Sequence, residues 1–434
     1  MADLQSELTF STKTRALTGE LTVPGDKSIS HRAVMFGAIA EGTTRIEGFL
    51  EGEDCLSTIG CMTALGAAII RDGDKVEVKG KGLKGLQEPK DVLNVGNSGT
   101  TARLIIGLLS GQPFYSVLSG DHSLNRRPMD RVVIPLREMG GTFYGRENGR
   151  FAPLSIVGGQ LKGIQYRSPV ASAQVKSSLI LAGLQADGET IVEEPYLSRD
   201  HSERMLRAFG VEIETKGAVH KVKGGQTLKA TAIKVPGDFS SAAFFIAAAL
   251  ITPGSDLTIK NVGINPTRTG LLDVLEKMGA NLTFLNEKVE NHEPVADIHV
   301  TSQPLKGTVV DGALIPRLID EVPILALIAS QAEGTTLIKD ARELRVKETD
   351  RIETVCQELK KLGVQIEPTE DGMVIQGQPN KPLNGGRVIS HGDHRIGMML
   401  GVASSVASEP IVLEGGEAIA VSFPGFYSLF EKEK

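Results

Sequence analysis

Residues 26–47 read DKSISHRAVMFGAIAEGTTRIE, and this stretch shows the pattern on which most of the chain is built. A polar opening leads into a run of small and apolar residues at 33–40, which is typical of a buried helix. A turn at Gly42 follows, and the β-branched residues Thr43, Thr44 and Ile46 indicate a short strand. After a polar loop, residues 55–66 have the pattern of a second, amphipathic helix that ends in Leu-Gly. The stretch therefore predicts helices that alternate with short strands.

The same pattern recurs along the chain at intervals of about 70 residues. Its openings lie near Ser30, Thr100, Ala173, Ser240, Val322 and His394. Solenoid repeats have shorter periods, of about 20–50 residues, so we expect each unit to be a small α/β module. Strand-like segments follow the second helix of the units, which gives the order strand, helix, strand, helix, strand. The predicted fold class is α/β (α+β) with six repeated units.

Two nearly identical segments divide these units into two groups of three. They are Val23-Pro24-Gly25-Asp26 and Val235-Pro236-Gly237-Asp238. Pro restricts and Gly frees the backbone torsions, which suits a hinge, although the same tripeptide is also a common turn. The six-unit count favours hinges near 24–26 and 236–238. We therefore expect one domain formed by residues 1–24 plus 237–434, with the N-terminal strand in it, and an inserted domain of residues 25–236.

Composition excludes several classes of protein. The 434 residues carry a net charge of −6, whereas binders of nucleic acid usually show a basic excess or stripe. The longest apolar run, residues 242–251, is far shorter than the roughly 20 residues that span a bilayer. No basic, apolar leader is visible at the N-terminus, and three cysteines without a CxxC pair suit a reducing compartment. We expect a cytoplasmic protein that binds neither membrane nor nucleic acid.

The predicted helix openings are rich in polar and basic residues. Helix N-termini bind anions well, because their first N–H groups have no partner within the helix. Ser, Thr, Asn and Asp at these positions could be simple N-caps, but the openings also supply Lys27, Arg32, Arg103 and Arg395. Further basic residues fall in loops: Arg126, Arg127, Arg131, Arg199, Arg345, Lys347 and Arg351. The pattern favours recognition of small anions. GDKSISH at 25–31 lacks the GxxxxGK[ST] spacing and GNSGTTAR at 96–103 does not match GxGxxG, so neither opening indicates a nucleotide site.

Acidic residues lie among these cations: Asp26, Asp320, Glu321, Glu348, Asp350 and Asp393. An acid flanked by Lys347 and Arg351 could be a structural ion pair or a tuned proton donor. Asp320, at the entry to an apolar helix, could also be a cap. The pair His391 and His394 is a weak metal signal without further ligands, so we expect no metal site.

Seven motifs, in order along essentially the whole chain, resemble the 5-enolpyruvylshikimate-3-phosphate synthase family. They are GDKSISHRA, GNSGTTARL, RRPMDR, SAQVKSSLILAGL, LIDEVPILA, ELRVKETDRI and GDHRIGM. The resemblance implies two domains, each of three βαβαββ units, that close on substrate between them. It also implies transfer of the enolpyruvyl group of phosphoenolpyruvate to the 5-hydroxyl of shikimate 3-phosphate, with release of phosphate through a tetrahedral intermediate. No metal or organic cofactor is implied.

The resemblance also implies roles for individual residues. Shikimate 3-phosphate would contact Lys27, Ser28, Arg32, Ser172, Ala173, Gln174, Arg199, Asp320 and Lys347. Phosphoenolpyruvate would contact Lys27, Gly99, Arg127, Gln174, Arg351 and Arg395. The proton-transfer pair would be Asp320 and Glu348, supported by Lys27, Lys347 and His394.

The sequence departs from the family pattern at three places, and one of them resembles a divergent bacterial branch. Ala173 stands where many members have Ser, and SRDHSERM at 198–205 replaces a segment that contains Tyr. Val421 lies where many members carry a nearby Lys. Gly99, rather than Ala, leaves room beside the phosphoenolpyruvate site, so we predict inhibition by glyphosate, which occupies that site in the family.

The sequence leaves two alternative functions open. The related UDP-N-acetylglucosamine enolpyruvyltransferases usually carry a reactive Cys on a mobile loop, whereas Cys55 and Cys61 lie around a predicted helix. A nucleic-acid-binding α/β repeat protein is the other reading, since RNA 3′-phosphate cyclases contain related modules. The negative charge and the lack of aromatic residues among the basic clusters count against it.

We expect the protein to be a monomer.

Overall fold

The computed structural model describes residues 7–12 and 16–433, and the chain forms two compact units. The terminal unit consists of Met1–Pro24, Pro236–Lys288 and Pro294–Lys434, and the inserted unit of Gly25–Val235 with Val289–Glu293. Each unit has its own hydrophobic core. Within residues 7–12 and 16–433, no helix combines the length and apolar character needed to cross a membrane.

The inserted unit contains three main sheets that repeat one strand order. The first is formed by β17 (Ala232–Lys234) and β16 (Leu228–Lys229), both beside β3 (Ala40–Glu47), then β5 (Lys75–Lys81) and β4 (Ala68–Asp72). The second runs β6 (Leu93–Asn94), β7 (Tyr115–Ser119), β9 (Phe151–Val157), β8 (Thr142–Gly145). The third runs β11 (Gln165–Arg167), β13 (Glu189–Glu193), β15 (Val219–Lys223), β14 (Ile213–Lys216). A short pair, β10 (Leu161–Lys162) and β12 (Ala186–Asp187), lies beside them in sequence. In each main sheet a parallel pair is followed by an antiparallel hairpin, as a βαβαββ unit requires.

Three helices of the inserted unit are buried along most of their length: α1 (Lys27–Ile39), α3 (Gly99–Ser110) and α6 (Ala173–Gly183). They are apolar on nearly every side after the first turn, which is typical of helices in a core. The second helix of each unit is more amphipathic and lies further out: α2 (Glu53–Ala64), α4 (Asp130–Glu138) and α7 (His201–Ala208). A single short turn, α5 (Arg146–Gly149), follows β8.

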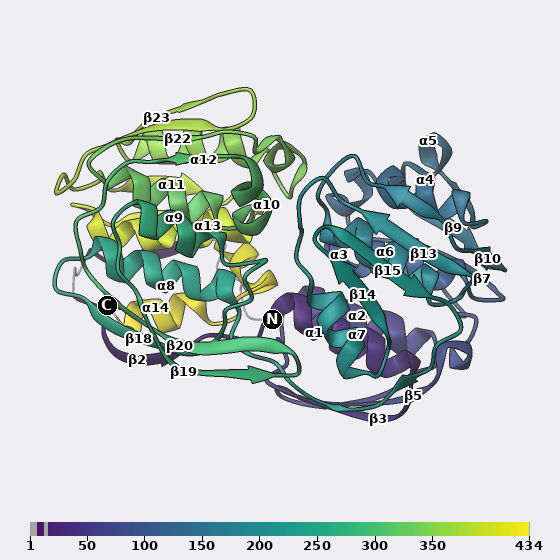
Figure 1. Ribbon diagram of the computed structural model, residues 1–434. Helices are drawn as coiled ribbons and strands as arrows, with labels where there is room; N and C mark the ends of the chain where they lie inside the picture. Colours follow the sequence, from purple (N-terminus) through teal and green to yellow (C-terminus); the bar gives the residue numbers. More distant parts are fainter. Residues whose placement is uncertain (1–6, 13–15, 434) are drawn as a thin grey trace. The chain divides into compact units, whose positions relative to one another are not determined.

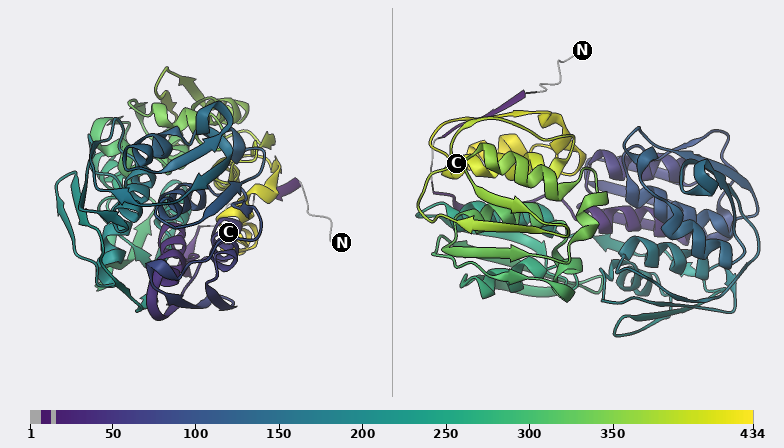
Figure 2. Two further views of the ribbon diagram at one scale, coloured as in Figure 1. Left: turned by 90° about the vertical axis from the view of Figure 1, so that its right-hand side faces the viewer. Right: turned by 90° about the horizontal axis from the view of Figure 1, so that it is seen from above.

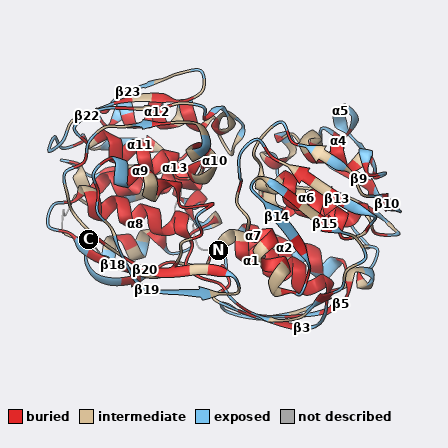
Figure 3. Cartoon of the chain, in the orientation of Figure 1, coloured by how far each residue is buried: buried red, intermediate tan, exposed pale blue. Residues whose placement is uncertain are grey.

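The terminal unit has the same organisation. Its central helices are α8 (Phe239–Ile251), α11 (Val322–Ser330) and α13 (His394–Ala403), and its other helices are α9 (Gly270–Lys277), α10 (Ile315–Leu318), α12 (Arg351–Lys361) and α14 (Phe426–Glu433). One sheet runs β2 (Thr18–Thr22), β18 (Asp256–Gly263), β20 (Glu293–Thr301), β19 (Thr283–Glu290). A second runs β21 (Val309–Val310), β22 (Gly334–Ile338), β24 (Met373–Gly377), β23 (Gln365–Pro368). In Figure 1, α8 and α11 lie between two sheets, with β22 and β23 on one side and β18 to β20 on the other. Figure 3 shows these helices as buried. The α/β fold class and the repeated βαβαββ unit are thereby confirmed.

The N-terminal segment completes two sheets of the terminal unit. Strand β2 pairs in parallel with β18, and β1 (Glu7–Phe10) pairs antiparallel with β26 (Ile411–Glu414). The last sheet therefore runs β1, β26, β25 (Gly386–Ile389), with β1 in the place that a hairpin strand takes in the other units. Figure 2 shows this strand beside the C-terminal elements of the same unit.

A cluster of aromatic rings fixes the two ends of the chain to each other. Aromatic residues are only 4% of the chain, yet the rings of Phe426 and Phe430 on α14 stack at 5.5 Å. Phe10 on β1 contacts Tyr427 at 5.1 Å between ring centres, and Phe245 on α8 contacts Phe430 at 6.1 Å. Ring contacts of these kinds add to the stabilisation that comes from the apolar area the rings bury.

The two Pro-Gly-Asp segments each precede a buried helix. Asp26 caps α1 by accepting from the backbone N–H of Ile29 at 2.9 Å, and Asp238 caps α8 by accepting from Ser241 at 3.1 Å. A Cβ at Gly25 would lie 1.8 Å from the carbonyl oxygen of Gly48, so only glycine fits there. The division between the units falls beside both segments.

Candidate functional site

Most of the predicted site residues of the inserted unit lie at the N-termini of its three buried helices, α1, α3 and α6. Ser98 caps α3 by accepting from the N–H of Thr101 at 3.1 Å, and Ser172 caps α6 by accepting from Val175 at 3.4 Å. These hydroxyls are therefore N-caps, as the simpler interpretation of the sequence has it. The basic side chains beside these caps have no role in capping, and they give the helix openings the positive charge that an anion site needs.

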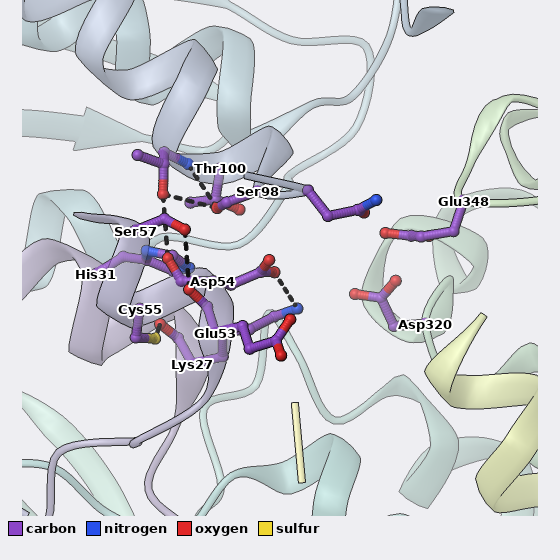
Figure 4. A network of polar contacts seen from close by, with 12 residues as sticks. Lys27, His31, Glu53, Asp54, Cys55, Ser57, Ser98, Thr100, Asp320 and Glu348 are labelled. Atoms are coloured by element: carbon purple, nitrogen blue, oxygen red, sulfur yellow. Dashed lines mark hydrogen bonds and ion pairs between the residues drawn. The ribbon is translucent and has the colours of Figure 1, made fainter. Parts of the chain in front are cut away.

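Two cations of α1 are held in different ways. Lys27 Nζ lies 3.0 Å from Asp54 Oδ2, and Figure 4 shows this ion pair. Arg32 is buried and donates to the hydroxyls of Ser202 at 2.7 Å and Ser177 at 3.1 Å, and to the carbonyl of Ser28 at 2.9 Å. Burial lowers the pKa of Arg32 to about 10, although Glu203 opposes the effect, and the side chain stays cationic at neutral pH. Neutral partners leave the charge of Arg32 available to an anion.

Gly99, the first residue of α3, lies between two guanidinium groups. A Cβ at this position would lie 2.9 Å from Arg103 Nη1 and 3.4 Å from Arg127 Nη1. Arg103 Nη1 donates to Gln174 Oε1 at 2.7 Å, and Gln174 Nε2 donates to Thr100 Oγ1 at 3.1 Å. The N-termini of α3 and α6 are thus joined through Gln174, which the resemblance assigns to both substrates.

A chain of buried side chains supports the start of α3, and Figure 4 labels the two residues at its ends, His31 and Ser98. His31 Nδ1 is 2.7 Å from Thr58 Oγ1, and that hydroxyl is 2.7 Å from Thr101 Oγ1. Thr101 in turn donates to Ser98 Oγ at 2.7 Å. Burial, with Lys27 and Arg32 nearby, keeps the pKa of His31 well below its usual value, so the imidazole is neutral.

The remaining predicted contacts of this unit lie on α6 and in the loop before α7. Ala173 and Gln174 form the first turn of α6. The backbone N–H of Ser172 donates to Glu194 Oε1 at 3.0 Å. Arg199 is half-buried and follows Ser198, whose hydroxyl donates to the same carboxylate at 2.9 Å. One buried acid therefore holds both segments.

The predicted site residues of the terminal unit gather around Arg351, the first residue of α12. Its side chain is 1% exposed and contacts three carboxylates. Nε donates to Asp393 at 2.8 Å, Nη1 to Asp320 at 3.2 Å and Nη2 to Glu348 at 2.6 Å. These acids raise the pKa of Arg351 against the effect of burial. Figure 4 shows the side chains of Asp320 and Glu348 close together.

Three further cationic or titratable residues complete this group. Arg395 Nη2 lies 3.5 Å from Asp320 Oδ2, and Arg395 Nη1 donates to the carbonyl of Asp320 at 3.3 Å. His394 begins α13, which Asp393 caps by accepting from the N–H of Arg395 at 2.9 Å. Lys347 precedes Glu348, and desolvation lowers its pKa, with Asp320 opposing and Arg351 adding to the shift.

A family profile described as EPSP synthase (3-phosphoshikimate 1-carboxyvinyltransferase) matches residues 11–430. The chain belongs to the EPSP synthase family. A relative from Bacillus cytotoxicus, named 3-phosphoshikimate 1-carboxyvinyltransferase, is 59% identical over 413 residues, 95% of this chain and 97% of the relative. One from Bacillus thuringiensis is 57% identical over 428 residues, 98% of this chain and 99% of the relative.

Comparison with solved structures agrees with this family assignment. An EPSP synthase structure from Acinetobacter baumannii is 48% identical and aligns with a TM-score of 0.88 over 98% of each chain. An enolpyruvyl transferase from Streptomyces tendae is 18% identical and aligns with a TM-score of 0.81 over 98% of this chain and 97% of its own. The second likeness shows the fold alone. The family profile, the relatives and the Acinetobacter structure confirm the resemblance that the seven motifs indicate.

Within each unit of this EPSP synthase family member, the predicted residues come together at helix N-termini. The inserted unit holds Lys27, Ser28, Arg32, Gly99, Arg127, Ser172, Ala173, Gln174 and Arg199, and the terminal unit holds Asp320, Lys347, Glu348, Arg351, His394 and Arg395. The structure adds two neighbours that the sequence analysis did not name, Asp54 and Glu194, and it adds Arg103, which the sequence analysis named as a cation of a helix opening without assigning it to a substrate. Arg103 has a signal in the sequence, because it lies one turn after Gly99 in a polar opening, whereas Asp54 and Glu194 have none.

Proposed function

We propose that this protein is a 3-phosphoshikimate 1-carboxyvinyltransferase, which transfers the enolpyruvyl group of phosphoenolpyruvate to the 5-hydroxyl of shikimate 3-phosphate and releases phosphate. The observation that carries the proposal is the family match over residues 11–430, together with relatives of that name at up to 59% identity over nearly the full chain. The site geometry agrees, because two polyanionic substrates require several fixed cations.

The reaction proceeds by addition and then elimination. In the addition, the 5-hydroxyl loses its proton to a base, its oxygen attacks C2 of phosphoenolpyruvate, and C3 gains a proton from an acid. In the elimination, the bond from C2 to the phosphate oxygen breaks and C3 loses a proton, which restores the double bond. Two carboxylates can divide this proton transfer if their surroundings give them different acidities.

The inserted unit supplies the proposed contacts to shikimate 3-phosphate. Arg32, Ser172 and Arg199 bind its charged groups, with Ser28, Ala173 and Gln174 beside them. Arg32 suits this task because its partners are hydroxyls and a carbonyl, so an anion does not have to displace a carboxylate from it. Lys27 contributes to both substrates.

The terminal unit supplies the proposed proton-transfer groups. Arg351 holds Asp320 and Glu348 against one guanidinium, which fixes the distance between them. Asp320 and Lys347 also contact shikimate 3-phosphate, and His394 supports the proton transfer. Arg351 and Arg395 bind phosphoenolpyruvate with Gly99, Arg127 and Gln174. Two buried guanidinium groups here supply the positive charge that many members obtain from a Lys near the position of Val421.

Three further properties belong to this proposal. The protein is a cytoplasmic monomer, the Pro-Gly-Asp segments at 24–26 and 236–238 act as hinges, and glyphosate inhibits at the phosphoenolpyruvate site. A monomer has a mass of 46.3 kDa, which light scattering after gel filtration measures directly. Cell fractionation tests the cytoplasmic location.

Phosphate release from the purified protein tests the proposed activity. We expect release only when phosphoenolpyruvate and shikimate 3-phosphate are both present, and we expect glyphosate to stop it. The product is confirmed by mass spectrometry, because hydrolysis of phosphoenolpyruvate also yields phosphate. Release that depends on UDP-N-acetylglucosamine instead would assign the chain to a different transferase, and release without any acceptor would contradict the transfer.

A further inference from the structure

A buried cluster of ionisable side chains lies directly behind the proposed shikimate 3-phosphate contacts. It consists of Lys176 on α6, Glu194 after β13, Glu203 on α7 and His220 on β15, each with a side chain no more than 1% exposed. Lys176 Nζ lies 3.1 Å from Glu194 and 2.9 Å from Glu203. His220 lies 3.5 Å from Glu194 and 2.8 Å from Glu203. Two carboxylates thus face two groups that can be cationic.

Glu194 is the member of the cluster that reaches the substrate-binding segments. Its Oε1 accepts from the backbone N–H of Ser172, the residue that caps α6. Its Oε2 accepts from the hydroxyl of Ser198 at 2.9 Å and from the backbone N–H of the same residue at 3.4 Å. Lys176 also donates to the Ser198 carbonyl at 3.4 Å. One carboxylate therefore joins the start of α6 to the residue before Arg199.

The same elements hold Arg32. The two hydroxyls that accept from its guanidinium belong to Ser177 and Ser202, which are the sequence neighbours of Lys176 and Glu203. These hydroxyls also contact each other at 2.6 Å. The cluster, Arg32 and the segments around Ser172 and Arg199 therefore form one continuous network.

The cluster keeps its carboxylates ionised despite burial. Burial raises the pKa of Glu203, but Lys176 and His220 outweigh it and bring the pKa to about 2. The pKa of Glu194 is also lowered, because contacts with His220, Lys176 and Ser198 outweigh burial. An ionised Glu194 is a strong acceptor for the backbone N–H groups that it holds.

We propose that Glu194 is a positioning residue for shikimate 3-phosphate: it contacts no substrate itself but holds Ser172 and the Ser198–Arg199 segment in the geometry that binds it. The inference rests on the proposed function of this site. A rigid support matters here because a displacement of about 1 Å in a binding group can cost up to about 100-fold in rate. Glu194 contacts both segments directly, Ser172 through one carboxylate oxygen and Ser198 through the other.

The variant Glu194→Gln tests this in the full-length protein. It keeps an oxygen for Ser172 but places an amide NH2 against Lys176 and Ser198, so the second segment loses its acceptor. We expect the Kd of shikimate 3-phosphate, measured by calorimetry, and its KM to rise about tenfold. The KM of phosphoenolpyruvate at saturating shikimate 3-phosphate should change less than about twofold.

His220→Gln is the matched control, because it removes a partner from the same cluster and leaves every contact of Glu194 with Ser172 and Ser198. We expect it to lower the thermal midpoint by as much as Glu194→Gln while the Kd of shikimate 3-phosphate stays within about twofold. If Glu194→Gln lowers the midpoint but leaves that Kd unchanged, the residue is only structural and the proposal is wrong.

Ser198→Ala covers the case in which Glu194→Gln does not fold. It removes a single hydroxyl contact with Glu194 and keeps all four charges of the cluster, so the protein should fold. A rise in the KM of shikimate 3-phosphate alone supports the proposal, and an unchanged KM contradicts it. Wild-type protein that releases no phosphate with both substrates would instead overturn the proposed function, and this inference with it.

Discussion

At the scale of single residues, Arg351 is the side chain around which the proposed acid and base of the terminal unit are arranged. Its contacts with Asp393, Asp320 and Glu348 engage four of the five N–H donors of a guanidinium. Lys has one compact ammonium and cannot hold three carboxylates in this fork-like geometry. The orientation of the proposed acid and base therefore depends on this one side chain.

We expect Arg351→Lys to lower kcat/KM by about 100-fold or more, because the geometry of the proton-transfer pair is lost although the charge remains. Steady-state kinetics measure the effect. Arg345→Lys is the control, since Arg345 pairs with Asp350 and Glu353 in a partly exposed setting. Surface pairs of this kind contribute little, so its activity should stay within about twofold. Equal losses in the two variants would contradict the role of Arg351.

Gly99→Ala tests the space beside the two guanidinium groups of α3. The added methyl group would meet Arg103 Nη1 at 2.9 Å, and it would contact Arg127 Nη1 at 3.4 Å. We expect the inhibition constant of glyphosate to rise about tenfold or more, because these cations must move from the proposed site. Gly60→Ala is the control, since a Cβ there meets nothing within 4 Å. Unchanged inhibition of Gly99→Ala would show that this space is not part of the glyphosate site.

His220 gives a prediction for pH. Burial lowers its pKa, but the contacts with Glu194 and Glu203 outweigh burial and raise it above its ordinary value of 6.5. A raised pKa in the folded state means that protonated His220 stabilises the fold below pH 6.5, and that this contribution is lost as pH rises through the raised value. The difference in unfolding free energy between wild type and His220→Gln should therefore shrink as pH rises. Urea titrations from acidic to basic pH measure this difference.

Some of these residues were predictable and others were not. Arg32, Gly99 and Arg395 stand in polar openings before apolar helices, and the 3.6-residue period identifies such openings in a single sequence. Glu194 gives no such signal, because an acidic residue at the end of a β-branched strand is common and does not by itself indicate a site. Its importance comes from Lys176 and His220, which come from other elements, and sequence spacing does not show that pairing.

At the scale of elements, the repeated unit was predictable because each copy contains a long apolar helix. Short strands were harder to predict. Strand β1 has four residues, and its partner β26 lies about 400 residues later in the chain. Nothing in four residues specifies so distant a partner, so the three-stranded sixth sheet emerges only from the structure.

The turn before α1 gives a prediction at this scale. A methyl group at Gly25 would overlap the carbonyl oxygen of Gly48 at 1.8 Å, and backbone cannot move aside as a flexible side chain can. We expect Gly25→Ala to lower the free energy of unfolding by about 2 kcal/mol or more. Chemical denaturation measures it, with Gly159→Ala as the control, since a Cβ there meets nothing within 4 Å. Equal stability of the two variants would contradict this account of the turn.

At the scale of the whole molecule, the two units differ in how they depend on the rest of the chain. The inserted unit completes its first sheet with its own β17, which pairs with β3. The terminal unit requires β1 and β2 from the start of the chain. Residues 25–235 should therefore fold alone, whereas residues 236–434 should not.

Expression of the two fragments tests this difference. We expect cooperative unfolding from 25–235 and aggregation from 236–434, because the second fragment leaves edges of β18 and β26 unpaired. Joining residues 7–24 after residue 434 through a flexible Gly/Ser linker should restore a folded protein, since Tyr427 on α14 already donates to the carbonyl of Thr9 at 2.8 Å. A stable fragment 236–434 without that addition would show that β1 and β2 are dispensable.

The pairing of β1 with β26 also sets an order of events during synthesis. The first strand leaves the ribosome when its partner has not yet been made, and translation at about 5–20 residues per second separates the two by tens of seconds. The inserted unit can be complete long before the ribosome reaches residue 411. Throughout that interval β1 has no partner strand and is exposed to other nascent chains, whereas β2 can pair once β18 has been made. Chaperones that bind extended segments should therefore be able to meet β1 early in synthesis and release it only after residues 411–414 have been made.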